Sequence, residues 1–478
     1  MKTHIKNLFH LPALITGLGV MLAGQAAAQT FTTLYSFTAL NNFGANSDGA
    51  GPTARLVLSG NTLYGTALYG GWVDGGYRAY GTVFALNTNG TGFTTLYNFT
   101  GDTDGANPSA GLILSGDTLY GTAERGGSEA AGSVFAVNTD GTGFRTVHSL
   151  DGSDGDSPSA GLVLSGNTLY GTAYDGGRYV VGSSGYGTVF AVNTDGTDFT
   201  PLYSFTPCPG PLFTNSDGDH PSAGLVLSGN TLYGTAMLGG SSGFGTVFAV
   251  NTDGTGFTTL HSFTDGSDGA NPHAGLVLSG NTLYGTAYAG GSLGHGTVFA
   301  VNTNGTGFTT LHSFTGGSDG AVPYAGLILS GNTLYGTAEE GGISTNGTVF
   351  AVNTDGTGFT TLYTFSNGSD GGSPAAGLVL SANTLYGTAY AGGSSGSGTV
   401  FSLTLPPVTA PQLTITPSGA SVILTWPAAG AGFTLQSTTN LGSLAFWTTN
   451  SPAPVVVNGQ NVVTNPLAGA QQFFRLSQ

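Results

Sequence analysis

The chain has 478 residues, of which 24 are acidic and eight are lysine or arginine, giving a formal net charge of −16 at pH 7. Such a chain repels phosphate-rich polymers and anionic lipid, so nucleic acid and membrane surfaces are not expected as partners. The single cysteine, Cys208, excludes an internal disulfide. Stability must therefore come from packing and hydrogen bonding.

Residues 1–28 differ from the rest of the chain. Lys2 and Lys6 open a basic stretch, residues 8–23 are largely apolar, and three alanines end at Ala28. This pattern predicts a secretory signal peptide. Its removal leaves six arginines against 24 acids, a net charge of −18. No later apolar segment is long enough to span a membrane, and we expect an exported monomer, extracellular or on the cell surface, with the periplasm as an alternative.

The peptide LYGTA occurs seven times, starting at Leu63, Leu119, Leu169, Leu232, Leu283, Leu334 and Leu385. In the fifth copy it belongs to a unit of four short apolar segments, residues 274–279, 282–287, 296–302 and 308–314. Tight-turn signals separate the first two segments and the last two, which predicts a four-stranded antiparallel meander.

The two ends of the repeat region indicate a closed ring. Residues 31–37 read as a fourth strand without the first three, and the last copy stops after its third strand near residue 405. The first strand can therefore complete the last unit. The sequence predicts an all-β protein with a seven-bladed β-propeller over residues 29–405, in which the N-terminal strand closes the last blade.

A Pro-rich linker at residues 406–411 precedes a region without LYGTA, residues 412–478. Its short alternating segments and Trp426 resemble a small fibronectin type III-like β-sandwich. Such a module would be a spacer, a carbohydrate contact or a sorting element.

The units DGANPHAGLVLSGNTLYGTAYAGG and GTVFAVNTDGTGFTTLYSF resemble the GloVer tandem repeat of exported bacterial proteins with varying C-terminal anchors. The resemblance covers nearly the whole repeat region. It implies an exported or surface-displayed propeller and brings no catalytic residues with it.

Variation between copies is concentrated at one end of the predicted disc, where the loops joining strands two to three and four to one emerge. We call this end the variable face. Its long loops include residues 68–80, 174–186 and 206–220. Aromatic side chains on loops can stack on sugar rings or anchor proteins, although they can also simply cover the core. The ligand-binding candidates are Trp72, Tyr77, Arg78, Tyr80, Tyr174, Arg178, Tyr179, Phe213 and Tyr324.

An Asp-Gly pair precedes a proline in all seven copies, at Asp48, Asp104, Asp154, Asp217, Asp268, Asp319 and Asp370. A sevenfold position favours a structural turn. Ca²⁺ is the one ion we consider, and no other cofactor is expected. Ca²⁺ needs six to eight oxygen ligands, which only local clusters of acidic residues could supply. These clusters are Asp102 with Asp104, Asp151 with Asp154 and Asp156, and Asp217 with Asp219.

The histidines form two groups. His148, His261 and His312 replace a tyrosine of the fourth strand and are expected to be packing residues. His220, His273 and His295 lie in variable-face loops of blades four and five, and are weak candidates for a catalytic or metal site if they converge.

The sequence favours a non-catalytic binding protein whose partner is a polysaccharide or a surface protein. Two alternatives remain: a polysaccharide lyase or hydrolase with its site on the same face, and a structural coat or matrix component. Convergence of His220, His273 and His295 with a carboxylate would favour the enzyme, and ordered self-assembly would favour the coat.

Overall fold

The computed structural model describes residues 29–73, 77–78, 80–178, 185–208, 214–406, 411–427, 433–439, 447–449, 453–457, 459–466 and 472–477. The predicted signal peptide, Tyr179 and Phe213 lie outside the described residues, as do the side chains of Tyr77 and Arg78.

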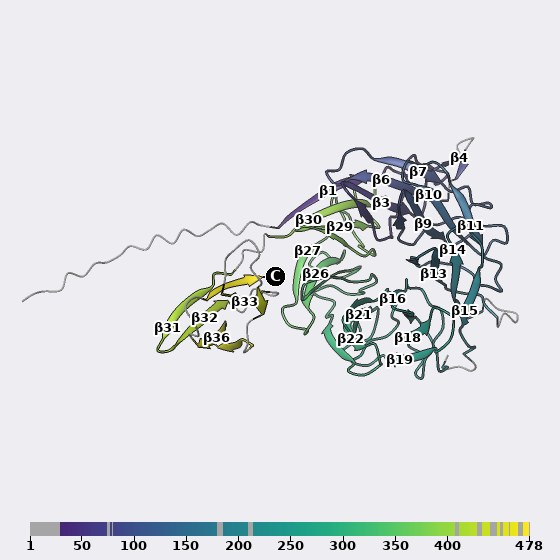
Figure 1. The fold of residues 1–478 in the computed structure, drawn as a ribbon. Helices are drawn as coiled ribbons and strands as arrows, with labels where there is room; N and C mark the ends of the chain where they lie inside the picture. The colour runs from purple at the N-terminus through teal and green to yellow at the C-terminus, as the bar shows by residue number, and fades with distance from the viewer. Residues whose placement is uncertain are drawn as a thin grey trace, which may run out of the picture.

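Seven four-stranded antiparallel sheets surround a central opening (Figure 1). Blade 1 contains β2 (Val57–Ser59), β3 (Thr62–Ala67), β6 (Thr82–Asn87) and β7 (Thr94–Asn98). Blade 2 contains β8 (Ile113–Ser115), β9 (Thr118–Ala123), β10 (Ser133–Asn138) and β11 (Arg145–Ser149). Blade 3 contains β12 (Val163–Ser165), β13 (Thr168–Ala173), β14 (Thr188–Asn193) and β15 (Thr200–Ser204). Blade 4 contains β16 (Val226–Ser228), β17 (Thr231–Ala236), β18 (Thr246–Asn251) and β19 (Thr258–Ser262). Blade 5 contains β20 (Val277–Ser279), β21 (Thr282–Ala287), β22 (Thr297–Asn302) and β23 (Thr309–Ser313). Blade 6 contains β24 (Ile328–Ser330), β25 (Thr333–Ala338), β26 (Thr348–Asn353) and β27 (Thr360–Thr364).

Blade 7 closes the ring as predicted. It consists of β28 (Val379–Ser381), β29 (Thr384–Ala389), β30 (Thr399–Thr404) and the N-terminal β1 (Thr30–Ser36). β1 lies beside β30, with register from Thr30↔Thr404 to Ser36↔Thr399 (Figure 1). The register shifts once along β1, as it does along the outer strand of the other six blades. β1 therefore takes the place of a regular fourth strand.

Packing contacts explain why the LYGTA strands have the same sequence in all seven blades. A Cβ on Gly285 would lie 2.6 Å from Cζ of Phe299, so glycine makes room for the ring on the neighbouring strand. The buried Thr286 donates its hydroxyl to the carbonyl of Ala325 in the next blade, at 3.2 Å. Both contacts recur in all seven blades, and Thr388 to Ala54 links blade 7 to blade 1. LYGTA thus serves the scaffold.

The C-terminal region forms two further sheets. A four-stranded sheet contains β31 (Thr414–Ser418), β32 (Ser421–Pro427), β36 (Gln460–Pro466) and β35 (Val455–Val457), and a three-stranded sheet contains β34 (Thr448–Thr449), β33 (Thr434–Thr438) and β37 (Phe473–Ser477). Trp426 is buried in a small core with Leu424, Leu435 and Val463. Among the described residues, no helix is long and apolar enough to cross a membrane.

Candidate functional site at the mouth of the central channel

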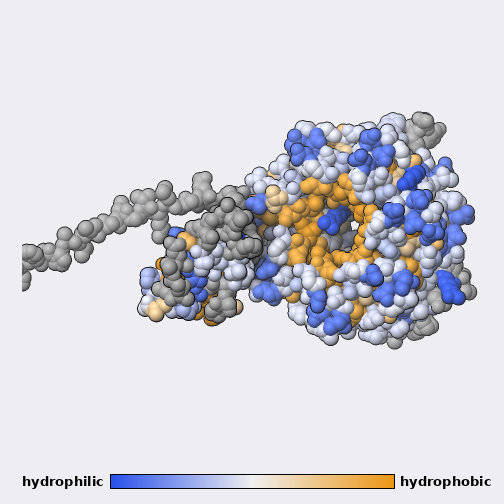
Figure 2. All heavy atoms as spheres, in the orientation of Figure 1, coloured by the Kyte–Doolittle hydropathy of each residue, from blue (hydrophilic) through white to orange (hydrophobic). Residues whose placement is uncertain are grey.

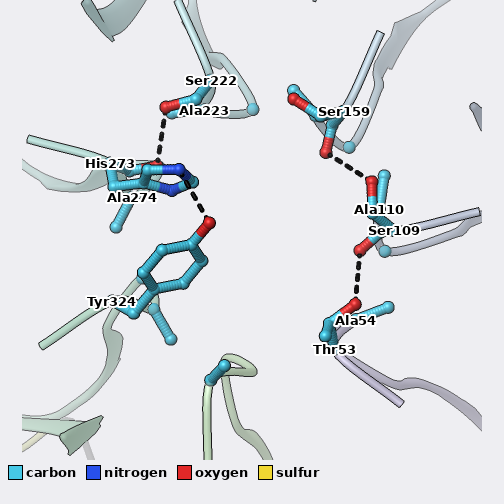
Figure 3. Close-up of a pocket in the computed structure, with 18 of the residues that line it drawn as sticks. Thr53, Ala54, Ser109, Ala110, Ser159, Ser222, Ala223, His273, Ala274 and Tyr324 are labelled. Atoms are coloured by element: carbon cyan, nitrogen blue, oxygen red, sulfur yellow. Dashed lines mark hydrogen bonds between the residues drawn. The ribbon is translucent and has the colours of Figure 1, made fainter. Parts of the chain in front are cut away.

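A cavity of about 880 Å³ occupies the centre of the ring and is lined by all seven blades. Hydrophobic residues surround the central opening on the face that Figure 2 shows, and hydrophilic atoms lie within it. We call this cavity the central channel. The residue after the repeated proline lines it in every blade: Thr53, Ser109, Ser159, Ser222, His273, Tyr324 and Ala375. Figure 3 labels the first six of these residues.

The second lining position is the first residue after the LYGTA strand. Five of these side chains reach the channel: Leu68, Glu124, Tyr174, Met237 and Tyr288. Strand two ends at the variable face, and strand one begins there, because an antiparallel chain reverses at each turn. The channel therefore opens onto the variable face.

A fixed turn brings the chain into the channel. The residue before the repeated proline has a positive φ in all seven blades: Gly51, Asn107, Ser157, His220, Asn271, Val322 and Ser373. A β-branched residue such as Val322 rarely adopts this conformation, so the surrounding structure imposes it. In blade 5, a Cβ on Gly245 of the preceding blade would lie 2.5 Å from Cδ of Pro272, so glycine gives the proline room. The scaffold thus fixes the backbone while leaving the next side chain free to vary.

His273 and Tyr324 form a polar pair on the channel wall. The Tyr324 hydroxyl lies 2.8 Å from Nε2 of His273, and the two ring centroids are 3.9 Å apart (Figure 3). Burial lowers the pKa of His273 to about 4 and raises that of Tyr324 to about 12. Ser222 donates to the backbone carbonyl of His273 at 3.3 Å. Both rings are therefore uncharged near neutral pH.

His220 lies beside the channel between two carboxylates. Its Nδ1 is 2.9 Å from Asp219, and its Nε2 is 3.2 Å from Asp175, a channel-lining residue. Burial lowers the pKa of His220, but the bonds to the two aspartates outweigh this and raise it to about 9. Cys208 donates to Asp219 at 2.7 Å, and burial next to that carboxylate raises the pKa of the thiol. Cys208 is therefore protonated rather than a nucleophilic thiolate.

The three candidate histidines have separate surroundings. His295 is exposed, and its ring packs over Gly316 of the following loop. Within the described part of the chain, no hydrogen bond, ion pair or ring contact joins any two of His220, His273 and His295, and no group of three acidic, histidine or cysteine side chains could hold a metal ion. The contacts thus give no support to a shared histidine site.

The predicted aromatic and arginine residues are distributed over the variable face. Tyr174 and Tyr324 line the channel. Tyr80 lines a second cavity of about 180 Å³, together with Leu40, Phe43 and Tyr69. Two exposed residues lie elsewhere on the face: Trp72 in β4 (Trp72–Val73), which pairs with β5 (Tyr77–Arg78), and Arg178.

The repeated aspartates tie each fourth strand to the loop that follows it. Asp104 accepts hydrogen bonds from the Tyr97 hydroxyl at 2.9 Å and from the Thr100 backbone N–H at 2.8 Å. The corresponding ring in the other blades is tyrosine or histidine, including His148, His261 and His312. Of the remaining calcium candidates, Asp151 accepts bonds within its own turn, Asp156 accepts one from Ser157, and Asp219 bonds Cys208 and His220. Exposed Asp102 belongs to the same loop as Asp104.

Two overlapping segments, residues 19–211 and 182–401, match the sequence profile of the Gloeobacter/Verrucomicrobia repeat. The chain belongs to this repeat family. The match confirms the resemblance inferred from the tandem units. No curated protein matches the chain significantly.

Several solved structures are similar in outline to this repeat protein. Oligogalacturonate lyase in complex with manganese is 12% identical, with a TM-score of 0.44 over 80% of this chain and 97% of that one. A chain of a nidogen/laminin complex is 16% identical, with a TM-score of 0.38 over 60% and 91%. TolB from Acinetobacter baumannii is 13% identical, with a TM-score of 0.35 over 58% of each chain. These identities and TM-scores are too low to carry an argument about function.

Sequence reasoning missed several residues of the channel and its mouth, among them Arg55, Glu124 and Tyr288. Their signal was present in the repeats. The residue directly after LYGTA changes from copy to copy, and Arg55 stands where the other six copies have glycine. Loop length drew attention to the long insertions, whereas these single-residue differences lie in short, regular segments.

Proposed function

We propose that this protein is an exported, non-catalytic binding protein whose variable face binds a saccharide at and beside the mouth of the central channel. The observation that supports it most is the position of the exposed large hydrophobic side chains. Every one described in the propeller lies on a variable-face loop: Leu40, Phe43, Tyr69, Trp72, Tyr288, Leu293, Ile343 and Tyr390.

Five of these eight side chains are aromatic, and several are close together. Phe43 and Tyr69 line the second cavity, and Trp72 follows Tyr69 within the same loop. Flat exposed rings can stack on the apolar faces of sugars at a small cost in side-chain entropy. A protein partner would use the same anchors, so it remains the alternative ligand.

The channel offers the polar groups that a saccharide also needs. Its wall carries the hydroxyls of Thr53, Ser109 and Ser159 across the channel from the His273–Tyr324 pair (Figure 3). Small-ligand sites combine apolar surface with a few placed polar groups, which is the combination found here.

The carboxylates at the channel mouth favour binding over hydrolysis. A glycoside hydrolase uses two carboxyl groups, one of which must act as an acid. Glu124 is 3.6 Å from Arg125, and Asp175 is 3.2 Å from the cationic His220, so both carboxylates have cationic partners. Burial holds the pKa of His273 at about 4 and that of Tyr324 at about 12, so neither ring changes its protonation state near neutral pH.

Export follows from the basic, apolar and small-residue pattern of residues 1–28. We assign the C-terminal sheets the role of a fibronectin type III-like spacer or sorting module, since the buried Trp426 gives them a separate core.

Pull-down on insoluble polysaccharides and soluble-glycan titration test this proposal. The double variant Tyr69→Ala/Trp72→Ala should lose roughly 10-fold or more in affinity, because each stacked aromatic contributes on the order of 1 kcal/mol. Asp117→Asn is the control, since Asp117 is exposed in the turn between strands one and two, at the opposite end of the propeller, where the other six copies have asparagine. Unchanged binding by the double variant would overturn the saccharide proposal, and turnover of the glycan would favour the enzyme alternative.

A further inference from the structure

The residues that follow the repeated prolines form one ring around the channel. Two residues further along each chain segment, a second ring of seven positions surrounds the channel farther from its mouth. It consists of Arg55, Gly111, Gly161, Gly224, Gly275, Gly326 and Gly377. A Cβ added to most of these glycines would lie 3.0 to 3.4 Å from the carbonyl oxygen of the preceding ring member. The backbones are therefore in close succession around the axis. The six glycines leave the space inside the ring open.

Arg55 is the one ring member with a side chain. Its Cβ lies 3.4 Å from where a Cβ of Gly111 would be, and its Cδ lies 3.5 Å from the corresponding point at Gly377. The side chain thus occupies space that a larger residue in the neighbouring blades would fill. An alanine at Gly111 or Gly377 would therefore touch the arginine side chain at an ordinary van der Waals distance.

The guanidinium of Arg55 has no partner among the described residues: no carboxylate lies within 4.0 Å, and it donates no hydrogen bond. Three other described arginines have partners. Arg125 pairs with Glu124, Arg145 donates to the Thr194 carbonyl at 2.9 Å, and Arg475 donates to Gln436 at 2.9 Å. Arg55 is exposed to the solvent of the channel, although the surrounding protein partly desolvates it and lowers its pKa. An arginine stays charged at neutral pH. Its five donors are available inside the channel.

The acids at the channel mouth do not cancel this charge. Glu124 and Asp175 already have cationic partners in Arg125 and His220. Burial, followed by the charge of Glu340, raises the pKa of Glu339, which makes its negative charge harder to maintain. Two of these three acids, Glu124 and Asp175, are therefore paired with cations, whereas Arg55 is unpaired deeper inside the channel.

We propose that Arg55 is the anion-binding group of the channel and that it pairs with the carboxylate of an acidic saccharide, such as a uronic acid. The inference rests on the proposed saccharide function and narrows its ligand. The planar guanidinium matches a carboxylate through two parallel hydrogen bonds, and the Thr53 and Ser109 hydroxyls line the wall above it.

A singly charged sugar fits this channel better than a polyanion. The chain has a net charge of −16, which repels ligands with several negative charges. One unpaired cation in the ring can neutralise one carboxylate. The hydroxyl and aromatic side chains of the wall suit the uncharged remainder of a sugar.

Ligand-detected NMR titration at fixed ionic strength tests the inference, with glucuronate and galacturonate as acidic probes, and glucose and galactose as neutral ones. Acetate and inorganic phosphate serve as bare anions. The variants are Arg55→Gln and Arg55→Lys. Arg145→Gln is the matched control, because it removes the same charge outside the channel. Melting temperatures establish that each variant is folded.

We expect at least one uronate to bind more tightly than its neutral parent. Arg55→Gln should weaken uronate binding roughly 10- to 100-fold and leave neutral sugars unchanged, with Arg55→Lys between the two. Equal binding of acidic and neutral sugars to wild type and Arg55→Gln would overturn the role of Arg55 but leave the saccharide function standing. If acetate or phosphate binds in an Arg55-dependent way and none of the sugars binds, both the acidic-saccharide assignment and the proposed function are overturned. If no probe binds, the inference is wrong.

Discussion

The LYGTA strands and the residues directly after them are adjacent in the chain but under different physical constraints. Inside the strand, Leu283 and Ala287 are fully buried, Gly285 makes room for Phe299, and Thr286 bonds the next blade. One residue further, Tyr288 is 39% exposed at the channel mouth. Four other copies have leucine, glutamate or methionine there, and two have tyrosine. Packing between blades requires the same residues in every copy as far as the alanine of LYGTA. The next residue is outside this packing. Differences between copies therefore begin where a ligand can reach the side chains.

The largest difference in stability between scaffold and variable face is expected when a large side chain is removed from between two blades. Phe299→Ala should lower the free energy of unfolding by about 3–5 kcal/mol, because Phe299 is fully buried and its loss leaves a cavity. Denaturant unfolding followed by circular dichroism measures this change. Ile343→Ala on the variable face should stay within about 0.5 kcal/mol of wild type. Similar losses in both variants would contradict the division into scaffold and face.

A smaller effect is expected from the repeated aspartate. Asp370→Asn should destabilise the protein by about 1–3 kcal/mol at pH 7, because its carboxylate accepts bonds from Tyr363 and from the Ser366 backbone. Burial raises the pKa of Asp370, but these bonds outweigh it and hold the pKa below its usual value. The stabilisation is therefore present above the ordinary aspartate range and lost as the pH falls through the lowered pKa.

Urea unfolding of wild type and Asp370→Asn between pH 2 and 7 measures this dependence. Asp117→Asn is the matched control: Asp117 is exposed in a turn where the other six copies have asparagine. A difference between wild type and Asp370→Asn that is independent of pH would show that the charge of Asp370 plays no part.

The smallest of the three effects concerns the variable face itself. His220→Asn, which introduces the residue found at this position in blades 2 and 5, should cost about 1–2 kcal/mol after allowance for solvent screening. Because the pKa of His220 is raised to about 9, its contribution is complete below the unfolded-state pKa of about 6.5 and is lost as the pH rises through 9.

Thermal melts of wild type and His220→Asn at pH 6, 8 and 10 check the sign, with histidine titration by NMR as a direct measure of the pKa. The two proteins should converge in stability at the highest pH. Divergence with rising pH would mean that the imidazolium does not bridge Asp175 and Asp219.

The repeats alone were sufficient to predict the propeller. Seven copies of one unit, with an orphan fourth strand at residues 31–37 and a last unit lacking that strand, have one consistent closure, and β1 pairs with β30 accordingly. The variable face also followed from the sequence, because antiparallel strands place alternate loops at the same end. The repeat register placed His273 and Tyr324 on the variable face, whereas their position on a channel wall came from the structure.

The contacts between the channel side chains depend on the tertiary structure. His273 and Tyr324 are 51 residues apart, so their contact depends on how neighbouring blades pack. The partners of His220 come from two loops, and the surroundings of Arg55 come from blades 2 and 7 as well as its own. A period of repeats fixes where each residue lies within its blade, whereas ring closure brings seven separate segments to one axis. The chemistry of the channel arises at that axis, from single-residue differences between otherwise equivalent positions.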